Sequence, residues 1–441
     1  MRYEILDPQG RPREAGEGAL VVEPDALVLT PRDGRPLVVR HVDIDAFEAA
    51  DYRLRVTLYT GDVLRAERLG AAFGQIVATL SASRDAAVRR DLLLESEPPS
   101  DAFPAAVHVS TWPAPDPRPA RVLVYRDQVA VVGDAFDPVL VPFAELATLR
   151  VDEAAYAIEL TDDEGTRVAI RKAGARSGEL AAALRDAVAG LDRRVAGILD
   201  GLGTGLDPLE LRGLVRLCRD GRALKETEAE ALRAGTWARL EQAVLSDPGL
   251  RTSYETLRAL GRPGQAWIGI QETAAAETDA EEGGGGVAAA GAGAEAEEPP
   301  PVPGTGAGDA PGDAQAPGSD GGGEAEREAP AFRCWYFVQV GNVIAHEVVS
   351  EGDHATYLYR AGPDPDRGVR ALNRALRLLS FRREPIYAPE EEMGVGRLAR
   401  YRAAMRKLDC LRHARGSFLG RALHTSAEAW RKAIEAARAK A

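Results

Sequence analysis

The stretch Glu272–Ala331 constrains the fold of this 441-residue chain more than any other feature. It is built mostly from Ala, Gly, Pro, Glu and Asp, and it contains no aromatic residue. Such a segment cannot bury enough apolar surface to offset the entropy that ordering costs. We therefore predict a disordered acidic linker over residues 272–331, with folded polypeptide on both sides of it.

This linker also carries the whole net charge of the chain. It holds fourteen acidic residues and one basic residue, a net charge of −13, and the complete sequence has the same net charge. The rest of the chain therefore balances 54 basic against 54 acidic side chains. Because the acidity lies in one segment, the low pI is only weak evidence against binding to nucleic acid.

Several features indicate a soluble cytoplasmic protein without a metal or a cofactor. The N-terminal sequence MRYEILDPQGRPREAG lacks the basic and then apolar pattern of a secretory signal. The longest fairly apolar run, Leu69–Ser83, is too short to cross a bilayer. Cys218, Cys334 and Cys410 lie far apart and form no C-x-x-C pair, so neither a disulfide framework nor a zinc knuckle is indicated.

Two regions of the chain show the same order of short alternating runs followed by one amphipathic helix. In the first region we expect strands at 19–23, 26–30, 37–40, near 44–47, at 52–58 and at 63–68, and a helix from Leu69 to about Leu80. In the second we expect strands at 121–125, 129–132, 139–142, 146–151, 156–160 and 167–170, and a helix through Leu180–Leu191.

The spacing of landmark residues is also the same in the two regions. Pro36 and Ile44 are eight residues apart, as are Pro138 and Leu146, and Tyr52–Gly61 matches Tyr156–Gly165. We predict a tandem duplication with a period of about 100 residues, so that each copy is a small domain.

An antiparallel meander closed by a C-terminal helix resembles the pleckstrin-homology-like (PH-like) fold. The stretch GALVVEPDALVLTPRDGRPLVVRHVDI (residues 18–44) is similar to the bacterial PH-like families. The resemblance covers about 18–95 and 118–195, and it implies two PH-like β-barrel or sandwich units, 1–100 and 101–198. Relatives that bind phosphoinositides use basic residues around the loop after the first strand. We place that loop at Glu23–Asp25 and Arg126–Gln128, which are acidic or poor in bases, so we do not expect inositide binding.

Residues 199–262 read as a helical segment that either packs on the second unit or forms a small domain of its own. Asp207-Pro208 is a typical helix start and Gly221 a typical stop. The motif Thr227-x-x-Glu230 predicts a capping box that opens a helix through about Leu245, and a shorter helix follows at 252–260.

A C-terminal α+β domain is expected from residues 263–271 plus 332–441. Gln265–Gln271 reads as a single strand before the linker, whereas 333–340 and 343–350 flank the hairpin signal Gly341-Asn342 and 355–360 makes a third strand. A lone strand needs a partner, so we predict that it pairs with this hairpin. Helices are expected at 366–379, 390–415 and 426–440, the last one opened by Thr425-x-x-Glu428.

One charge asymmetry is informative: from Arg367 onward the chain has eighteen basic residues and only seven acidic ones. The candidate anion- or partner-binding residues lie on the predicted helix 390–415: Arg397, Arg400, Arg402, Arg406, Lys407, Arg412 and Arg415. A basic amphipathic helix can bind nucleic acid, an anionic membrane or an acidic protein. One alternative is a solvated helix face whose apolar stripe is in the core. Another is a weak, salt-sensitive contact with the acidic linker.

Other polar residues give no catalytic or metal-binding pattern. His346-Glu347, Asp353-His354 and Cys334 are metal-ligand types, but neighbouring residues on a strand point to opposite faces, so we predict no metal site. Arg415, Arg421 and His424 flank Ser417–Gly420, and we expect a structural polar cluster where two helices meet.

The sequence contains none of the motifs G-x-S-x-G, H-E-x-x-H and G-x-x-x-x-G-K-[ST]. Our leading hypothesis is a non-enzymatic cytoplasmic adaptor that binds other proteins through the PH-like units and the C-terminal domain. The alternative is an anion-binding protein that uses the basic helix, masked by the linker, on nucleic acid or an anionic membrane. The third is an enzyme of unrecognised type.

Overall fold

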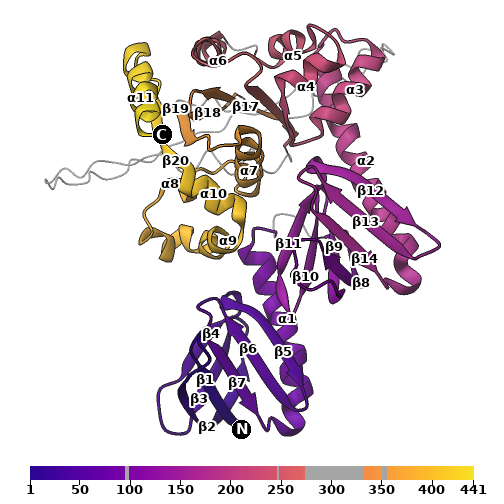
Figure 1. Cartoon of the computed structure of the whole chain (residues 1–441), viewed down its shortest axis with the longest axis vertical. Coiled ribbons are helices and arrows are strands. Elements are labelled where there is room, and N and C mark those ends of the chain that lie inside the picture. The colour runs from indigo at the N-terminus through magenta and orange to yellow at the C-terminus, as the bar shows by residue number, and fades with distance from the viewer. Residues whose placement is uncertain (95–98, 246–247, 274–331, 350–354) are drawn as a thin grey trace, which may run out of the picture. The chain divides into compact units, whose positions relative to one another are not determined.

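The structure, a computed structural model, describes residues 1–94, 99–245, 248–273, 332–349 and 355–441. Residues Met1–Glu272 and Phe332–Ala441 form one compact unit. Its fold is mixed α+β with three antiparallel sheets (Figure 1), which confirms the predicted fold class at that level. The linker predicted over 272–331 begins too early, because Glu272 is the last residue of a strand, and its residues 274–331 lie outside the described ranges. In the described residues, no helix has both the length and the apolarity that a membrane span requires.

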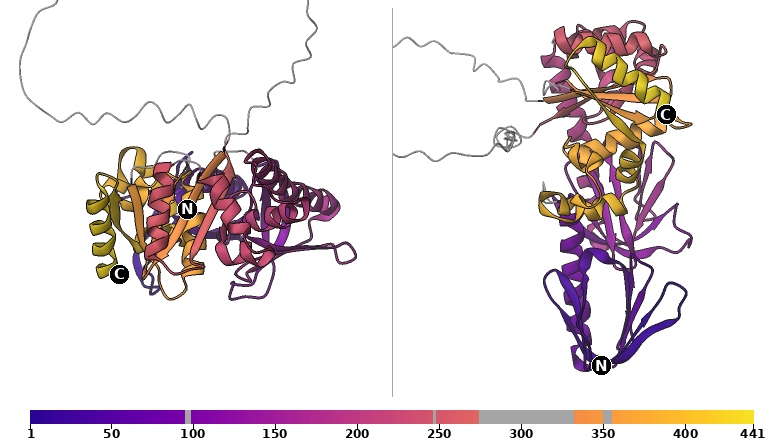
Figure 2. Two further views of the ribbon diagram at one scale, coloured as in Figure 1. Left: turned by 90° about the horizontal axis from the view of Figure 1, so that it is seen from above. Right: turned by 90° about the vertical axis from the view of Figure 1, so that its left-hand side faces the viewer.

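The first sheet has seven strands in the order β4-β3-β2-β1-β7-β6-β5. Because β1 pairs with both β2 and β7, the sheet is continuous, and its strands fold over into two layers (Figure 2). The short 3-10 helices η1 (His41–Asp43) and η2 (Gly70–Ala72) precede β5 and helix α1 (Phe73–Asp91), respectively. The strands are β1 (Arg2–Leu6), β2 (Pro12–Val22), β3 (Ala26–Pro31), β4 (Leu37–Arg40), β5 (Ile44–Ala50), β6 (Arg53–Leu58) and β7 (Val63–Glu67).

The second sheet repeats this order strand for strand, as β11-β10-β9-β8-β14-β13-β12. Two short turns, η3 (Phe143–Glu145) and η4 (Gly174–Arg176), occupy the positions of η1 and η2, and helix α2 (Ser177–Gly201) follows. The strands are β8 (Asp101–Val109), β9 (Arg118–Val124), β10 (Gln128–Gly133), β11 (Phe136–Pro142), β12 (Leu146–Asp152), β13 (Ala157–Asp162) and β14 (Arg167–Arg171).

Backbone details also repeat between the two sheets. Tyr52 and Tyr156 both have positive φ, 58° and 48°. The amide of His41 donates to the carbonyl of Asp25 at 3.1 Å, and 102 residues later the amide of Phe143 donates to the carbonyl of Asp127 at 2.9 Å. We call residues 2–91 copy 1 and residues 101–201 copy 2. A residue of copy 1 and its equivalent in copy 2 are separated by 102 positions in strands β2, β3, β4 and β5. The separation is 104 positions in β1, β6, β7 and α1.

The first strand of each copy was not predicted. Strand β1 lies ahead of the patterned region, and β8 contains Pro104, which lacks the amide that a ladder hydrogen bond needs. The loop after the first strand is therefore 7–11 in copy 1 and 110–117 in copy 2. The stretches Glu23–Asp25 and Arg126–Gln128 instead follow the second strand, so their assignment to the first loop was wrong.

The third sheet has six strands in sequence order. Strand β16 pairs antiparallel with β17, with Ala266 opposite Val338 and Glu272 opposite Phe332, so the predicted pairing across the linker is present. The two edge strands were not predicted. The strands are β15 (Ala223–Lys225), β16 (Ala266–Glu272), β17 (Phe332–Val340), β18 (Val343–Val348), β19 (Ala355–Arg360) and β20 (Phe418–Leu423).

One face of the third sheet is covered by the end of α2 and by five further helices, which share one apolar core with β16–β18. The helical segment after copy 2 therefore belongs to this core and does not form one of its own. These helices are α3 (Pro208–Cys218), α4 (Glu226–Leu232), α5 (Thr236–Val244), α6 (Pro248–Leu260) and α11 (Ala427–Lys440).

Helix caps explain two differences from the predicted boundaries. Asp207 and Glu210 form the capping box of α3. The helix expected through Leu245 is two helices, because Gly235 at φ 85° interrupts it and the Glu230 carboxylate accepts hydrogen bonds from the amides of Gly235 and Trp237. At α11 the cap is the Ser426 hydroxyl, not Thr425.

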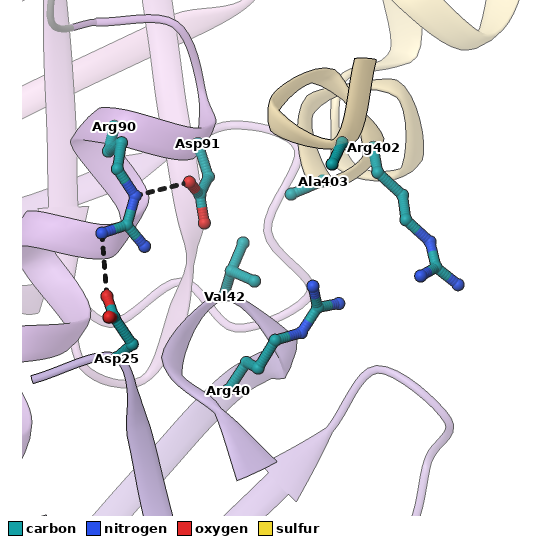
Figure 3. A pocket seen from close by; sticks show the side chains of 8 residues that line it. Asp25, Arg40, Val42, Arg90, Asp91, Arg402 and Ala403 are labelled. Carbon is teal, nitrogen blue, oxygen red and sulfur yellow. Dashed lines mark hydrogen bonds and ion pairs between the residues drawn. The ribbon is translucent and has the colours of Figure 1, made fainter. Parts of the chain in front are cut away.

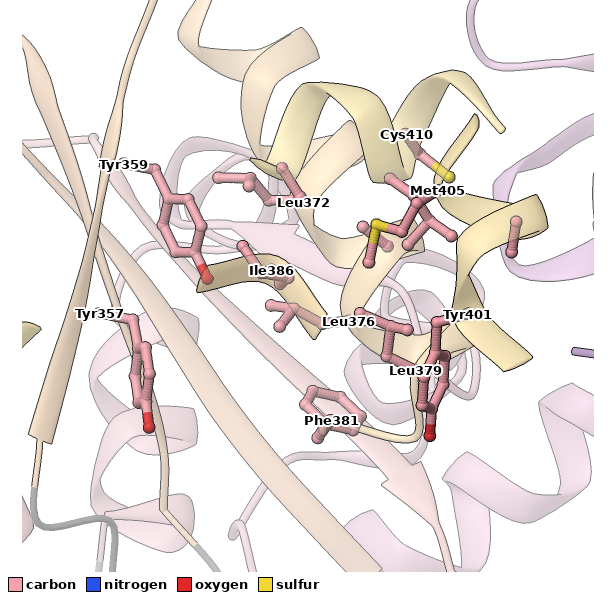
Figure 4. Packing of buried hydrophobic residues seen from close by; sticks show 14 of the residues in the cluster. Tyr357, Tyr359, Leu372, Leu376, Leu379, Phe381, Ile386, Tyr401, Met405 and Cys410 are labelled. Carbon is pink, nitrogen blue, oxygen red and sulfur yellow. The ribbon is translucent and has the colours of Figure 1, made fainter. Parts of the chain in front are cut away.

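The other face of the third sheet packs against the segment 365–417 (Figure 4). The single helix predicted over 390–415 is wrong. The helix is interrupted at Gly396, which has φ 58°, and at Leu408, which is in extended conformation. The elements are α7 (Pro365–Leu378), α8 (Glu384–Tyr387), η5 (Glu392–Gly394), η6 (Gly396–Tyr401), α9 (Arg402–Lys407) and α10 (Asp409–Ser417).

Candidate functional site

The outer face of β9–β11 in copy 2 is an interface. In register, Ala130 lies between Leu123 and Leu140, and this row faces away from the core of copy 2. Leu123 and Ala130 are buried and share an apolar cluster with Val88 of helix α1 and with Leu92, the residue that follows this helix. The last turns of the helix of copy 1 therefore lie in the same apolar cluster as this sheet face of copy 2, and the segment 365–417 also contributes to that cluster.

Polar contacts fix α1 in this position. The Arg84 guanidinium is buried and donates to four backbone carbonyls: Ile44 (3.3 Å) and Asp45 (2.6 Å) of copy 1, and Gly133 (2.7 Å) and Phe136 (3.2 Å) of copy 2. Two further contacts join α1 to copy 2, an ion pair of Asp85 with Arg121 and a hydrogen bond from Ser81 to Asp134. One buried cation thus holds the backbones of both copies together.

Arginines of the segment 365–417 pair with equivalent acids of the two copies. Arg374 of α7 pairs with buried Glu145 of copy 2, and Arg406 of α9 pairs with Asp43, its equivalent in copy 1, at 2.9 Å. Arg377 pairs with Asp127 of copy 2 at 3.0 Å. The acidic position shared by Asp43 and Glu145 therefore binds a cation of the C-terminal segment in both copies.

The structure spreads the seven predicted basic residues over η6, α9 and α10, and most of them bind internal partners. Lys407 shows this most clearly, because it is nearly buried and its ammonium contacts Asp45 of copy 1 and Asp137 of copy 2. The others with acidic partners are Arg397 with Glu384, Arg406 with Asp43, Arg412 with Asp409 and Arg415 with Glu390. Arg400 donates to the Tyr401 hydroxyl. Of these contacts, those of Arg406 and Lys407 join the segment to the two copies, whereas the others lie within the segment itself.

Arg402 differs from the other six basic residues. It is exposed, and no ion pair or hydrogen bond of its side chain is found among the described residues. It lines a cavity of about 360 Å³ together with Asp25, Arg40, Val42, Arg90, Asp91, Ala399 and Ala403 (Figure 3). This cavity was not predicted, since its walls come from copy 1 and from residues more than 300 positions later.

Cys334, His346 and Glu347, the metal-ligand types that the structure describes, do not converge. Within the described ranges, no group of three or more His, Cys, Asp or Glu side chains has the geometry for a metal ion. His346 stacks on Phe337, and burial lowers its pKa to about 3. Glu347 lies on the opposite face of β18, as predicted, against Thr356 and His424. Asp353 and His354 lie outside the described residues.

The predicted cluster of Arg415, Arg421 and His424 does not form. Residues Phe418–Leu423 are strand β20 instead of a link between helices, so these side chains take separate directions. Arg415 donates to the Pro385 carbonyl at 2.9 Å and Arg421 lies over the Tyr387 ring, whereas His424 reaches Glu347. The three residues therefore serve separate local contacts.

The interface residues were not predicted, because each of them is ordinary in isolation. Arg84 is one of many helical arginines, and only the three-dimensional packing shows that its four acceptors come from two copies. The available signal was the duplication, since aligning the copies matches the row Leu123–Ala130–Leu140 to Val21–Val28–Val38.

A search against family models and a search of the curated proteins found no match to this chain.

Proposed function

We propose that this chain is a non-enzymatic adaptor of the cytoplasm, in which copy 1 binds an amphipathic helix of a partner protein on its outer sheet face. One observation carries the proposal: the equivalent face of copy 2 holds helix α1. A duplicated module that binds a helix at one copy has, at the other, a surface of the same construction. In this proposal both copies are PH-like units that serve protein contacts.

The equivalent face of copy 1 is open. Val28 lies between Val21 and Val38 in the same register that places Ala130 between Leu123 and Leu140. Val21 is 51% exposed and Val38 is 60% exposed, whereas Leu123 is 6% exposed. The three valines form an apolar row across β2, β3 and β4, and apolar stripes of this kind receive the apolar face of a helix.

Differences between the copies define the expected partner helix. On copy 2, α1 contributes Val88 and Leu92, four residues apart, and its Ser81 donates to Asp134. The equivalent of Asp134 in copy 1 is Arg32, which is largely exposed and only 3.9 Å from Glu17. We therefore infer a helix with apolar residues at i and i+4, and with an acidic residue where α1 has Ser81.

Recovery of partners from native extract tests this proposal. The full-length chain is compared with the double variant Val21→Asp, Val38→Asp, and with Val395→Asp as a matched control, because Val395 is an exposed valine (66%) outside copy 1. We expect a reproducible partner that the double variant loses and the control retains. A partner set that is identical for all three proteins, or no reproducible partner, contradicts the proposal.

A further inference from the structure

We propose that the cavity at Arg402 binds a small molecule that carries a phosphate group. The cavity has a volume of about 360 Å³, which is within the range of small-molecule sites. Its walls combine a small apolar surface, Val42, Ala399 and Ala403, with three arginines. This inference is separate from the helix-binding face, because none of the three valines of that face lines the cavity.

The charges of the cavity leave one cation without a counter-charge. Arg90 holds both Asp25 and Asp91, at 3.0 and 2.9 Å. Asp43 is shared by Arg40 and Arg406, each at 2.9 Å. Counting Asp43 and its partner Arg406, which do not line the cavity, four guanidinium groups are matched by three carboxylates, and the excess positive charge is that of Arg402. An anion that enters the cavity supplies the missing charge.

The arrangement of the arginines favours a phosphate group. Figure 3 shows Arg40 and Arg402 on one side of the cavity and the group of Arg90, Asp91 and Asp25 on the other. A guanidinium presents five N–H donors, and two of them side by side offer more donors than one carboxylate can accept. A phosphate group has three strong acceptor oxygens and matches the planar fork of arginine. The acidic side of the cavity can accept hydrogen bonds from hydroxyl groups of the same molecule.

The equivalent acids of copy 2 have different partners. The equivalents of Asp25 and Asp43 in copy 2 are Asp127 and Glu145, which pair with Arg377 and Arg374 of helix α7. In copy 1, Asp43 pairs with Arg406 of the segment 365–417, whereas Asp25 pairs with Arg90 of α1. The space next to Asp25 is therefore open in copy 1.

Titration calorimetry with the full-length chain tests the site. The probes are inorganic phosphate and glycerol 3-phosphate, at constant ionic strength set with chloride. We expect Arg402→Gln to weaken the binding of both at least about tenfold, since a charge-assisted contact is lost. Arg397→Gln is the control, because Arg397 is exposed, lies on the same segment and does not line the cavity. We expect its affinity to equal that of the wild type.

A vesicle experiment separates a free phosphate compound from a lipid headgroup. Flotation with phosphatidic acid in phosphatidylcholine is compared with phosphatidylcholine alone. The proposal predicts binding of the soluble probes and no vesicle binding that depends on Arg402. Vesicle binding that Arg402→Gln abolishes, with no binding of soluble phosphate, overturns it. Absence of phosphate binding, or equal losses in the Arg402 and Arg397 variants, overturns it as well.

Discussion

Copy 1 and copy 2 have the same strand order and the same register, yet their outer faces differ in use. In copy 2 the row Leu123–Ala130–Leu140 lies under helix α1, whereas in copy 1 the row Val21–Val28–Val38 is open to solvent at both ends. The side chains agree with this difference, because Ala130 at the centre lets a helix approach the sheet closely, whereas copy 1 has the larger Val28. The repeated fold thus has two surfaces in the same register, and the described part of the chain covers only one of them.

The acidic pairs show a second difference of the same kind. Copy 2 pairs Asp127 and Glu145 with two arginines of one helix, and copy 1 divides the equivalent acids among arginines of three elements. The contact with copy 2 is buried at Glu145, whereas that with copy 1 surrounds an open cavity. We infer that copy 2 anchors the C-terminal segment and that copy 1 presents the surfaces available to ligands.

The largest effect is expected at the junction of the copies. Arg84→Ala removes the cation that serves four carbonyls and leaves those acceptors without a donor. We expect a loss of about 4 kcal/mol in the free energy of unfolding. Urea denaturation measures it, and Arg185→Ala, at an exposed position of α2, is the control. A loss no greater than that of the control would show that the copies are not joined through Arg84.

Substitution of the equivalent acids should lower the free energy of unfolding by different amounts in the two copies. Glu145→Gln leaves the largely buried Arg374 charge without its counter-charge, and we expect a loss of about 3 kcal/mol. Asp43→Asn in copy 1 acts on the more exposed Arg40 and Arg406, so we expect about 1 kcal/mol. Denaturation of both variants under one condition compares them. Equal losses would contradict the assignment of copy 2 as the anchor.

Truncation of equivalent apolar residues compares the two faces directly. Leu123→Ala creates a cavity under α1 and should cost about 2.5 kcal/mol. Val21→Ala, at the equivalent position of copy 1, changes an exposed side chain and should cost less than about 0.5 kcal/mol. Thermal and urea unfolding give both values. A large loss at Val21 would mean that the face of copy 1 is already covered in the free protein.

The smallest effect concerns pH. Burial, with a contribution from Glu145, raises the pKa of Asp163 in copy 2 to about 6, against the effect of Arg370. The unfolded chain has the ordinary aspartate value of about 3.9, so the folded chain binds more protons between about pH 4 and 6. The contribution of Asp163 to stability therefore decreases as the pH rises through this window. Asp163→Asn should remove that decrease in urea titrations at several pH values, whereas an unchanged slope would assign it to other groups.

Much of the fold could be predicted from local patterns. Alternating runs indicated the later strands of each copy, and the isolated strand before the linker indicated its pairing with the hairpin. The first strands were missed because β8 contains Pro104 and because the short strand β1 lies ahead of the patterned region. The region 390–415 reads as one helix by its spacing, but Gly396 and the extended Leu408 end the helical runs.

Only part of the candidate site could be predicted from the sequence. The basic residues of the C-terminal segment were identified by charge, yet charge alone does not separate Arg402, which faces a cavity, from Lys407, which is paired with Asp45 and Asp137. That distinction depends on acids of copy 1 and copy 2, and no local pattern places those acids next to a segment so distant in sequence. The duplication was the one sequence signal that led toward the helix-binding face.

Site-specific photo-crosslinking probes the proposed helix-binding face of copy 1 in the cell. A photoreactive phenylalanine derivative is placed at Val38, on the open face of copy 1, or at the similarly exposed Val395 as a control. Crosslinked peptides from cells that express the full-length chain are then identified by mass spectrometry. We predict crosslinks at Val38, absent at Val395, to one amphipathic helical segment of another protein with an acidic residue beside its apolar stripe. Crosslinks of equal yield at both positions, or none at Val38, would contradict the helix-binding role of copy 1.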